Sequence, residues 1–251
     1  MQPPRPYVLT IAGFDPSGGA GVLADCKTFE QHGVYGFGVC TALTVQTDDS
    51  FLNMHWLSAE QIIEQLQPLV SKFVVSACKI GIINSPETLL TVIRFLKDYN
   101  PAIRIVWDPV LKASAGFEFH EVNTFRNLEE ILTEVTLLTP NYNELQQLQL
   151  ITGEKLIKDD HAVFCPVLLK GGHRPDALGT DTLYEPGGFT VIEAGVDKVF
   201  PKHGSGCVLS AAIAARLATG QPLKKCCKLA KQYVETFLNS NQSLLGYHSV
   251  C

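Results

Sequence analysis

Short apolar runs alternate along the chain with longer segments that mix apolar and polar residues. The short runs predict buried strands, and the longer segments predict helices that bury one face. Strands alternating with helices are typical of a largely parallel sheet covered by helices. The predicted strands are residues 7–12, 37–46, 74–80, 103–107, 135–139 and 167–170.

Capping signals mark several helix starts. Ser58 precedes Gln61 by three positions, a capping box that predicts a helix to about residue 73. Ser85 before Pro86 predicts an N-cap followed by proline at the first helical position. Further helices are expected over 18–31, 86–99, 123–134, from Asn141 onward, 205–218 and 222–238, and a hairpin over 182–192.

The 251 residues are 46% hydrophobic and 18% charged, which suits one α/β domain, residues 1–251. The net charge of −5 gives no support for binding to nucleic acid or to an anionic membrane. No apolar run approaches the ~20 residues of a membrane span. The basic cluster of Lys224, Lys225, Lys228 and Lys231 favours an exposed helix face over a polyanion site.

The eight cysteines form no C-x-x-C pair and show no spacing typical of a zinc site. Residues 1–7 are proline-rich and polar, unlike a signal peptide. These features favour a reducing, cytoplasmic compartment, with most cysteines serving as small buried residues.

The most informative motif is residues 203–207, His-Gly-Ser-Gly-Cys, at the start of a predicted helix of small residues. Free backbone N–H groups and the positive end of the helix dipole make such a start an anion site. The same position predicts a lowered pKa for Cys207. An anion site beside a base suits transfer of a negatively charged group. The alternative is that Cys207 is only a small buried residue.

Other polar residues follow predicted strands, whose carboxyl ends meet at one sheet edge. Asp108 and Glu144 are separated carboxylates that suit Mg²⁺ beside phosphate, unless they are a turn residue and a helix-start carboxylate. Lys170 would reach phosphate oxygens, unless it extends to solvent. Gln46 offers a donor and an acceptor side by side, which complements an aminopyrimidine edge.

In this order the motifs resemble those of the hydroxymethylpyrimidine/phosphomethylpyrimidine kinases of thiamine biosynthesis, within the ribokinase-like superfamily. The resemblance spans about residues 8–237. It rests on residues 9–21, 24–29, 41–46, 79–81, 108–110, 139–144, 169–173 and 203–207. The glycine-rich loop at 13–21 matches neither the Walker nor the Rossmann pattern.

The resemblance implies a three-layer α/β/α fold with a mostly parallel central sheet, and it assigns site residues. The implied catalytic residues are Cys207, Gly204, Ser205 and Gly206. The implied substrate-binding residues are Gly13, Ala20, Asp25, Gln46, Ile82 and Val110. The implied nucleotide-binding residues are Asn141, Lys170 and Gly172, and the implied metal-binding residues are Asp108 and Glu144. Asp25 would lie near the substrate hydroxymethyl group, and its alternative is an exposed helix carboxylate. ATP and Mg²⁺ are the implied cofactors, and we expect a homodimer.

The chain departs from the family in two places. Only residues 151–166 stand where the family has an extra helix, which predicts a trimmed fold, and residues 111–117 lack the family's usual form. We predict an ATP- and Mg²⁺-dependent kinase that phosphorylates 4-amino-5-hydroxymethyl-2-methylpyrimidine, its monophosphate, or both. The alternatives are a pyridoxal or pyridoxine kinase on the same scaffold and a catalytically idle, ligand-binding paralogue.

Overall fold

A computed structural model of the protein describes residues 4–111, 128–153, 155–172 and 179–249. The strands are β1 (Tyr7–Phe14), β2 (Tyr35–Gln46), β3 (Phe51–Trp56), β4 (Val75–Ile80), β5 (Arg104–Trp107), β6 (Leu137–Leu138), β7 (Ile157–Lys158), β8 (His161–Ala162), β9 (Val167–Leu169), β10 (Asp181–Glu185) and β11 (Gly188–Ile192). The helices are α1 (Gly21–Gln31), α2 (Ala59–Lys72), α3 (Pro86–Tyr99), α4 (Leu128–Glu134), α5 (Tyr142–Thr152), α6 (Ser205–Ala218) and α7 (Leu223–Leu238).

One sheet holds nine of these strands, in the order β11-β10-β9-β6-β5-β4-β1-β2-β3. Pairing is parallel from β2 through β1, β4, β5 and β6 to β9. The strands β3, β10 and β11 add to its two ends in antiparallel pairs. The predicted mostly parallel sheet and the predicted hairpin are therefore confirmed.

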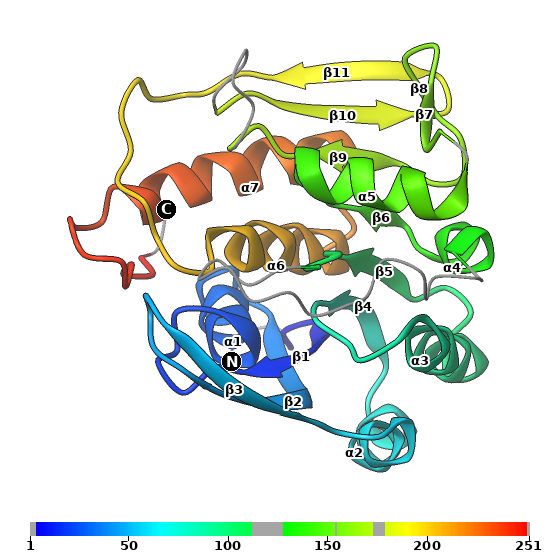
Figure 1. Ribbon diagram of the computed structural model, residues 1–251. Coiled ribbons are helices and arrows are strands. Elements are labelled where there is room, and N and C mark those ends of the chain that lie inside the picture. The colour runs from blue at the N-terminus through cyan, green and yellow to red at the C-terminus, as the bar shows by residue number, and fades with distance from the viewer. Residues whose placement is uncertain (1–3, 112–127, 154, 173–178, 250–251) are drawn as a thin grey trace.

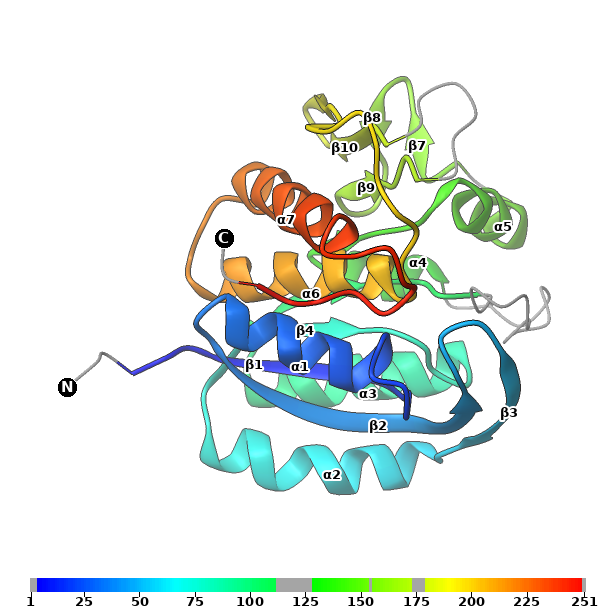
Figure 2. The same cartoon turned by 90° about the vertical axis from the view of Figure 1, so that its left-hand side faces the viewer.

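Helices cover both faces of the sheet, so the molecule has three layers (Figure 1). One face packs against α2, α3, α4 and α5 through side chains such as Leu66, Ile93 and Leu148. The other face packs against α1, α6 and α7, with Phe29, Ile213 and Tyr233 in its core. The helix α6 lies between α1 and α7, and its alanines let it pack closely on the sheet (Figure 2).

Local signals set most element boundaries. Ser58 and Gln61 form the predicted capping box, and Ser85 accepts a hydrogen bond from the N–H of Thr88 at the start of α3. The sequence did not predict β3, whose residues are partly or fully exposed and include no β-branched type. The helix expected from Asn123 has only α4 among the described residues, because residues 112–127 lie outside them.

Among the described residues between α5 and β9 there is no helix, in keeping with the short length of residues 151–166. The two-stranded sheet of β7 and β8 occupies the segment between α5 and β9. Within the described ranges, none of the helices combines the length and apolar content that crossing a bilayer requires.

The order of the strands fixes where a ligand can bind. From β1 the chain first pairs with β2 on one side and then returns to pair β4 on the other. At such a switch point the loops after neighbouring strands diverge and leave a crevice beyond their carboxyl ends. In Figure 2, β1 and β2 run from left to right, and the start of α6 lies at that same right-hand edge.

The capping box gives a test of the local signals. Ser58→Ala removes a side chain that accepts from the Gln61 N–H, so we expect the free energy of unfolding to fall by about 1 kcal/mol. Ser71→Ala, in the exposed last turn of the same helix, is the matched control and is expected to leave stability unchanged or to raise it by up to about 0.5 kcal/mol. Urea denaturation of both variants measures the difference, and equal effects would contradict the role of the cap.

Candidate active site

A cavity of about 920 Å³ opens at the carboxyl edge of the sheet. All the predicted site residues except Asp25 line it. They are Gly13, Ala20, Gln46, Ile82, Val110, Asp108, Asn141, Glu144, Lys170, Gly172, Gly204, Ser205, Gly206 and Cys207. Its size falls within the range of small-molecule sites, about 300–1,000 Å³.

The start of α6 forms the floor of this cavity. Gly204 is the N-cap, and the N–H of Val208 makes the first helical hydrogen bond, to the Gly204 carbonyl at 3.0 Å. The N–H groups of Ser205, Gly206 and Cys207 precede that bond, and they supply the anion-binding character of a helix start.

Only glycine fits at position 204. Its φ is +73°, a conformation that costs other residues energy. A Cβ atom there would lie 2.1 Å from the carbonyl oxygen of Gly19. The helix start is therefore held directly against the glycine-rich loop after β1.

That loop is also held to the start of α6 by a contact between Asp15 and His203, which the sequence did not reveal. The Asp15 carboxylate accepts hydrogen bonds from the N–H groups of Ser17 and Ala20, each at 2.9 Å, and it contacts His203 Nε2 at 2.9 Å. Burial opposes ionisation of Asp15, but its bonds to His203 and Ser17 outweigh it and lower its pKa. Behind it, the His203 N–H donates to the Leu244 carbonyl at 2.9 Å.

Cys207 contradicts the expectation of a reactive thiolate. Burial raises the pKa of its thiol, and the nearby Lys79 opposes this only in part. The predicted lowered pKa was therefore wrong, because the loss of solvent outweighs the dipole of α6. The side chain is half-buried at the cavity floor as a thiol.

Asp25 lies outside the cavity. The side chain is fully buried and pairs with Lys79 Nζ at 2.8 Å, with Thr10 Oγ1 donating to the same carboxylate. The pair excludes the alternative of an exposed helix carboxylate. Burial lowers the pKa of Lys79, but the Asp25 carboxylate outweighs burial and raises it, so the lysine is charged where it lines the cavity.

Lys170 joins the two predicted metal-binding carboxylates. Its Nζ lies 2.7 Å from Asp108 Oδ1 and 3.7 Å from Glu144 Oε2, so it does not simply extend to solvent. Burial opposes its charge, but the two carboxylates prevail and raise the pKa of Lys170. Burial, helped by the charge of Asp108, raises the pKa of Glu144 in spite of Lys170.

The helix start of α5 orders this cluster. Asn141 caps α5 by accepting from the Glu144 N–H at 2.9 Å, and Glu144 in turn accepts from the Asn141 N–H at 2.7 Å. Gly206 faces the cluster from α6, since a Cβ atom there would lie 3.4 Å from Lys170 Nζ. The helix start and the charged cluster therefore meet across a short gap.

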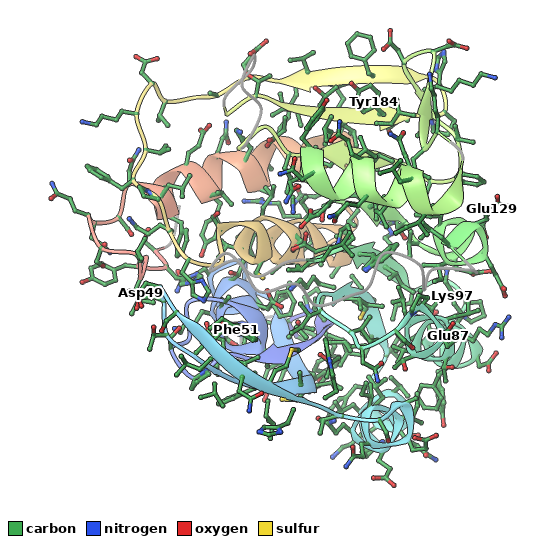
Figure 3. All side chains as sticks on the ribbon, viewed as in Figure 1. Asp49, Phe51, Glu87, Lys97, Glu129 and Tyr184 are labelled. Carbon is green, nitrogen blue, oxygen red and sulfur yellow. The ribbon has the colours of Figure 1, made fainter. Side chains whose placement is uncertain are left out.

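The remaining walls differ in chemistry. At one end, Gln46 finishes β2 and pairs with Phe51 of β3, and both line the cavity. Figure 3 labels Phe51 and Asp49 at this hairpin. At the other end, apolar side chains of α6, α7 and the segment after β11 form a wall. They are Ala194, Val196, Val199, Leu209, Val234 and Leu238. The sequence signalled neither Phe51 nor this wall, because both depend on contacts between distant segments.

Known proteins match the chain over most of its length. A family model described as phosphomethylpyrimidine kinase matches residues 15–250. The hydroxymethylpyrimidine/phosphomethylpyrimidine kinase of Staphylococcus aureus (strain MRSA252) is 35% identical over 236 residues, 90% of this chain and 85% of that protein.

Two solved structures share the fold. The crystal structure of phosphomethylpyrimidine kinase from Clostridium difficile 630 has a TM-score of 0.72 and 31% identity, covering 92% of this chain and 98% of that chain. The pyridoxal kinase of Staphylococcus aureus in complex with AMP-PCP and pyridoxal has a TM-score of 0.79 and 26% identity, covering 98% and 94%.

These matches confirm the ribokinase-like α/β fold and the family resemblance that the motifs predicted. They also support phosphotransfer from ATP, since neighbouring kinases were solved with a nucleotide analogue. The chain belongs to the phosphomethylpyrimidine kinase family.

Proposed function

We propose that the chain phosphorylates the hydroxyl of 4-amino-5-hydroxymethyl-2-methylpyrimidine, and also its monophosphate, with ATP as the donor. The observation that carries this proposal is the convergence of Gln46 and the start of α6 on one cavity. The first suits the edge of an aminopyrimidine ring, and the second suits the phosphoryl group in transfer.

The acceptor binds at the end of the cavity near β1 and β2. The Gln46 amide pairs with a ring nitrogen and the adjacent amine, and Ile82 and Val110 contact the ring faces. Gly13 and Ala20 are small residues that leave room in this wall of the cavity. At Gly13 a Cβ atom would lie 2.5 Å from Ile82 Cδ1. Asp25 is not among the lining residues, so it would act on the acceptor only through its partner Lys79, which does line the cavity.

The nucleotide occupies the other end. Its base packs on the apolar wall formed with Leu209 and Val234, and its phosphates reach Lys170, Asn141 and Gly172. Transfer of a phosphoryl group depends mainly on positioning and on neutralising charge. The N–H groups of Gly204–Cys207 and the ammonium of Lys170 supply both.

Asp108 and Glu144 fit Mg²⁺. Both offer carboxylate oxygens on one wall, and a single lysine balances two potential negative charges. Among the described residues, no group of three or more His, Cys, Asp or Glu side chains could hold a metal. Mg²⁺ instead takes one or two carboxylates, waters and substrate phosphates, and would neutralise phosphate charge there.

We also propose a homodimer in the cytoplasm. On the β2–β3 hairpin, Leu43, Val45 and Leu52 are 47%, 44% and 72% exposed, which suits burial against a second copy. The seven described cysteines are free thiols, consistent with a reducing compartment.

Acceptor choice is the direct test of the proposed function. We expect kcat/KM for the pyrimidine alcohol to exceed that for pyridoxal, and we expect the pyrimidine monophosphate to be phosphorylated as well. ADP release with the three acceptors, measured side by side, gives the comparison. A higher kcat/KM for pyridoxal favours the pyridoxal kinase alternative, and no turnover with any acceptor favours the idle paralogue.

Cys207 is proposed as the base that takes the acceptor proton. Because burial raises the pKa of its thiol, the reactive thiolate becomes more abundant as the pH rises through and above neutrality, and kcat/KM should rise with it by up to about tenfold per pH unit. Cys207→Ser should lose about 10²-fold in kcat and lose that rise. Cys40→Ser, a half-buried thiol elsewhere, is the control. If the serine variant keeps both rate and profile, the helix start alone performs the transfer.

The metal assignment is tested through the Mg²⁺ requirement. Asp108→Asn and Glu144→Gln each remove one negative charge, so half-maximal activity should need about tenfold more Mg²⁺ while KM for the pyrimidine stays within about twofold. Glu129→Gln, an exposed carboxylate on α4 labelled in Figure 3, is the control. An unchanged Mg²⁺ titration in both variants would leave them as a turn residue and a helix cap.

A further inference from the structure

Two charged residues of α7 are buried, and one of them, Lys231, belongs to the basic cluster for which the sequence predicted an exposed helix face. Lys231 and Glu235 lie one turn apart and are each 8% exposed, and both line the cavity. Other lysines of the same cluster, such as Lys228, are exposed as expected. Charges are rarely buried unless they are paired, so each of these two requires a partner.

Lys231 binds at the neck of the loop after β9, by which we mean the two chain segments on either side of this loop, at Gly171 and at Gly179–Asp181. Its Nζ lies 3.1 Å from Asp181 Oδ2 and donates to the Gly179 carbonyl. The other oxygen of Asp181 accepts from the Gly171 N–H at 2.7 Å, and the Gly179 N–H donates to the Gly171 carbonyl at 3.0 Å. The neck is tight, since a Cβ on Gly171 would lie 2.0 Å from the Thr180 carbonyl oxygen.

Glu235 binds the segment that follows β11, which lines the cavity beside the apolar wall. Its Oε1 accepts from the Gly195 N–H at 2.8 Å, in the segment that leads from β11 toward α6. A Cβ on Gly195 would lie 2.6 Å from Glu235 Oε2, so the backbone approaches the carboxylate closely. The neighbours Ala194 and Val196 belong to the apolar wall.

The two contacts flank the β10–β11 hairpin, and each leads directly to a proposed nucleotide contact. Gly171 stands between Lys170 and Gly172, and Gly195 stands between two wall residues. Neither Lys231 nor Glu235 contacts the pyrimidine end, where Gln46 and Ile82 lie, in any described bond. Their influence should therefore fall on one substrate and spare the other.

We infer that Lys231 and Glu235 are positioning residues for the nucleotide: from one face of α7 they fix the phosphate-binding neck and the apolar wall at the spacing ATP requires. The inference rests on the proposed location of the nucleotide. If the two residues were purely structural, substituting them would lower the stability of the protein and weaken the binding of both substrates alike.

Binding of ADP in the presence of Mg²⁺, measured by calorimetry without acceptor, tests this. Lys231→Met keeps most of the side-chain volume but removes the ammonium, and we expect ADP affinity to fall about tenfold. Affinity for the pyrimidine alcohol should stay within about twofold. Lys228→Met, the same change one turn earlier on an exposed position, should alter neither. Unchanged ADP affinity, or equal loss for both ligands, overturns the inference.

Glu235 provides a second test that does not depend on the folding of the lysine variant. Glu235→Leu removes the acceptor for the Gly195 N–H and should weaken ADP binding, whereas Glu235→Gln keeps an oxygen acceptor and should restore most of it. Equal affinity of the two variants for ADP contradicts the role. Lys170→Met tests the proposed nucleotide location separately. Acceptor preference does not affect an ADP titration, so failure of this inference can be told apart from failure of the proposed function.

Discussion

The close approach of Gly204 to the Gly19 carbonyl fixes the relation between the two most important segments of the cavity. With φ at +73° and no side chain, Gly204 lets the start of α6 rest on the loop after β1. The contact between Asp15 and His203 holds the same two segments together a few residues away. The loop after β1 and the start of α6 are therefore held against each other where both line the cavity.

Around that surface, three largely buried lysines each have a carboxylate partner. Lys79 pairs with Asp25, Lys170 with Asp108 and Glu144, and Lys231 with Asp181. Three lysines thus surround a cavity in a chain whose net charge is negative. The carboxylates keep the three ammonium groups charged at the cavity and balance them, so these groups give the cavity no large net positive charge.

Much of the fold could be predicted because its signals are local. The capping box at Ser58, the Ser85-Pro86 start and the apolar runs of β1, β4 and β5 each depend on a few neighbouring residues. All but one of the predicted site residues line the cavity, and many of them follow parallel strands whose carboxyl ends meet at one edge of the sheet. The failures share one cause. The pKa of Cys207 and the burial of Asp25 and Lys231 depend on which distant segments exclude water, and no short stretch of sequence encodes that.

The hydrogen bond from the His203 N–H to the Leu244 carbonyl has a consequence for synthesis of the protein. The segment around Leu244 follows α7, so it emerges from the ribosome long after β1, α1 and the start of α6. Until it is made, the residue before Gly204 lacks a backbone partner. The strands of the sheet are therefore all synthesised before the residue that precedes the start of α6 can gain this partner.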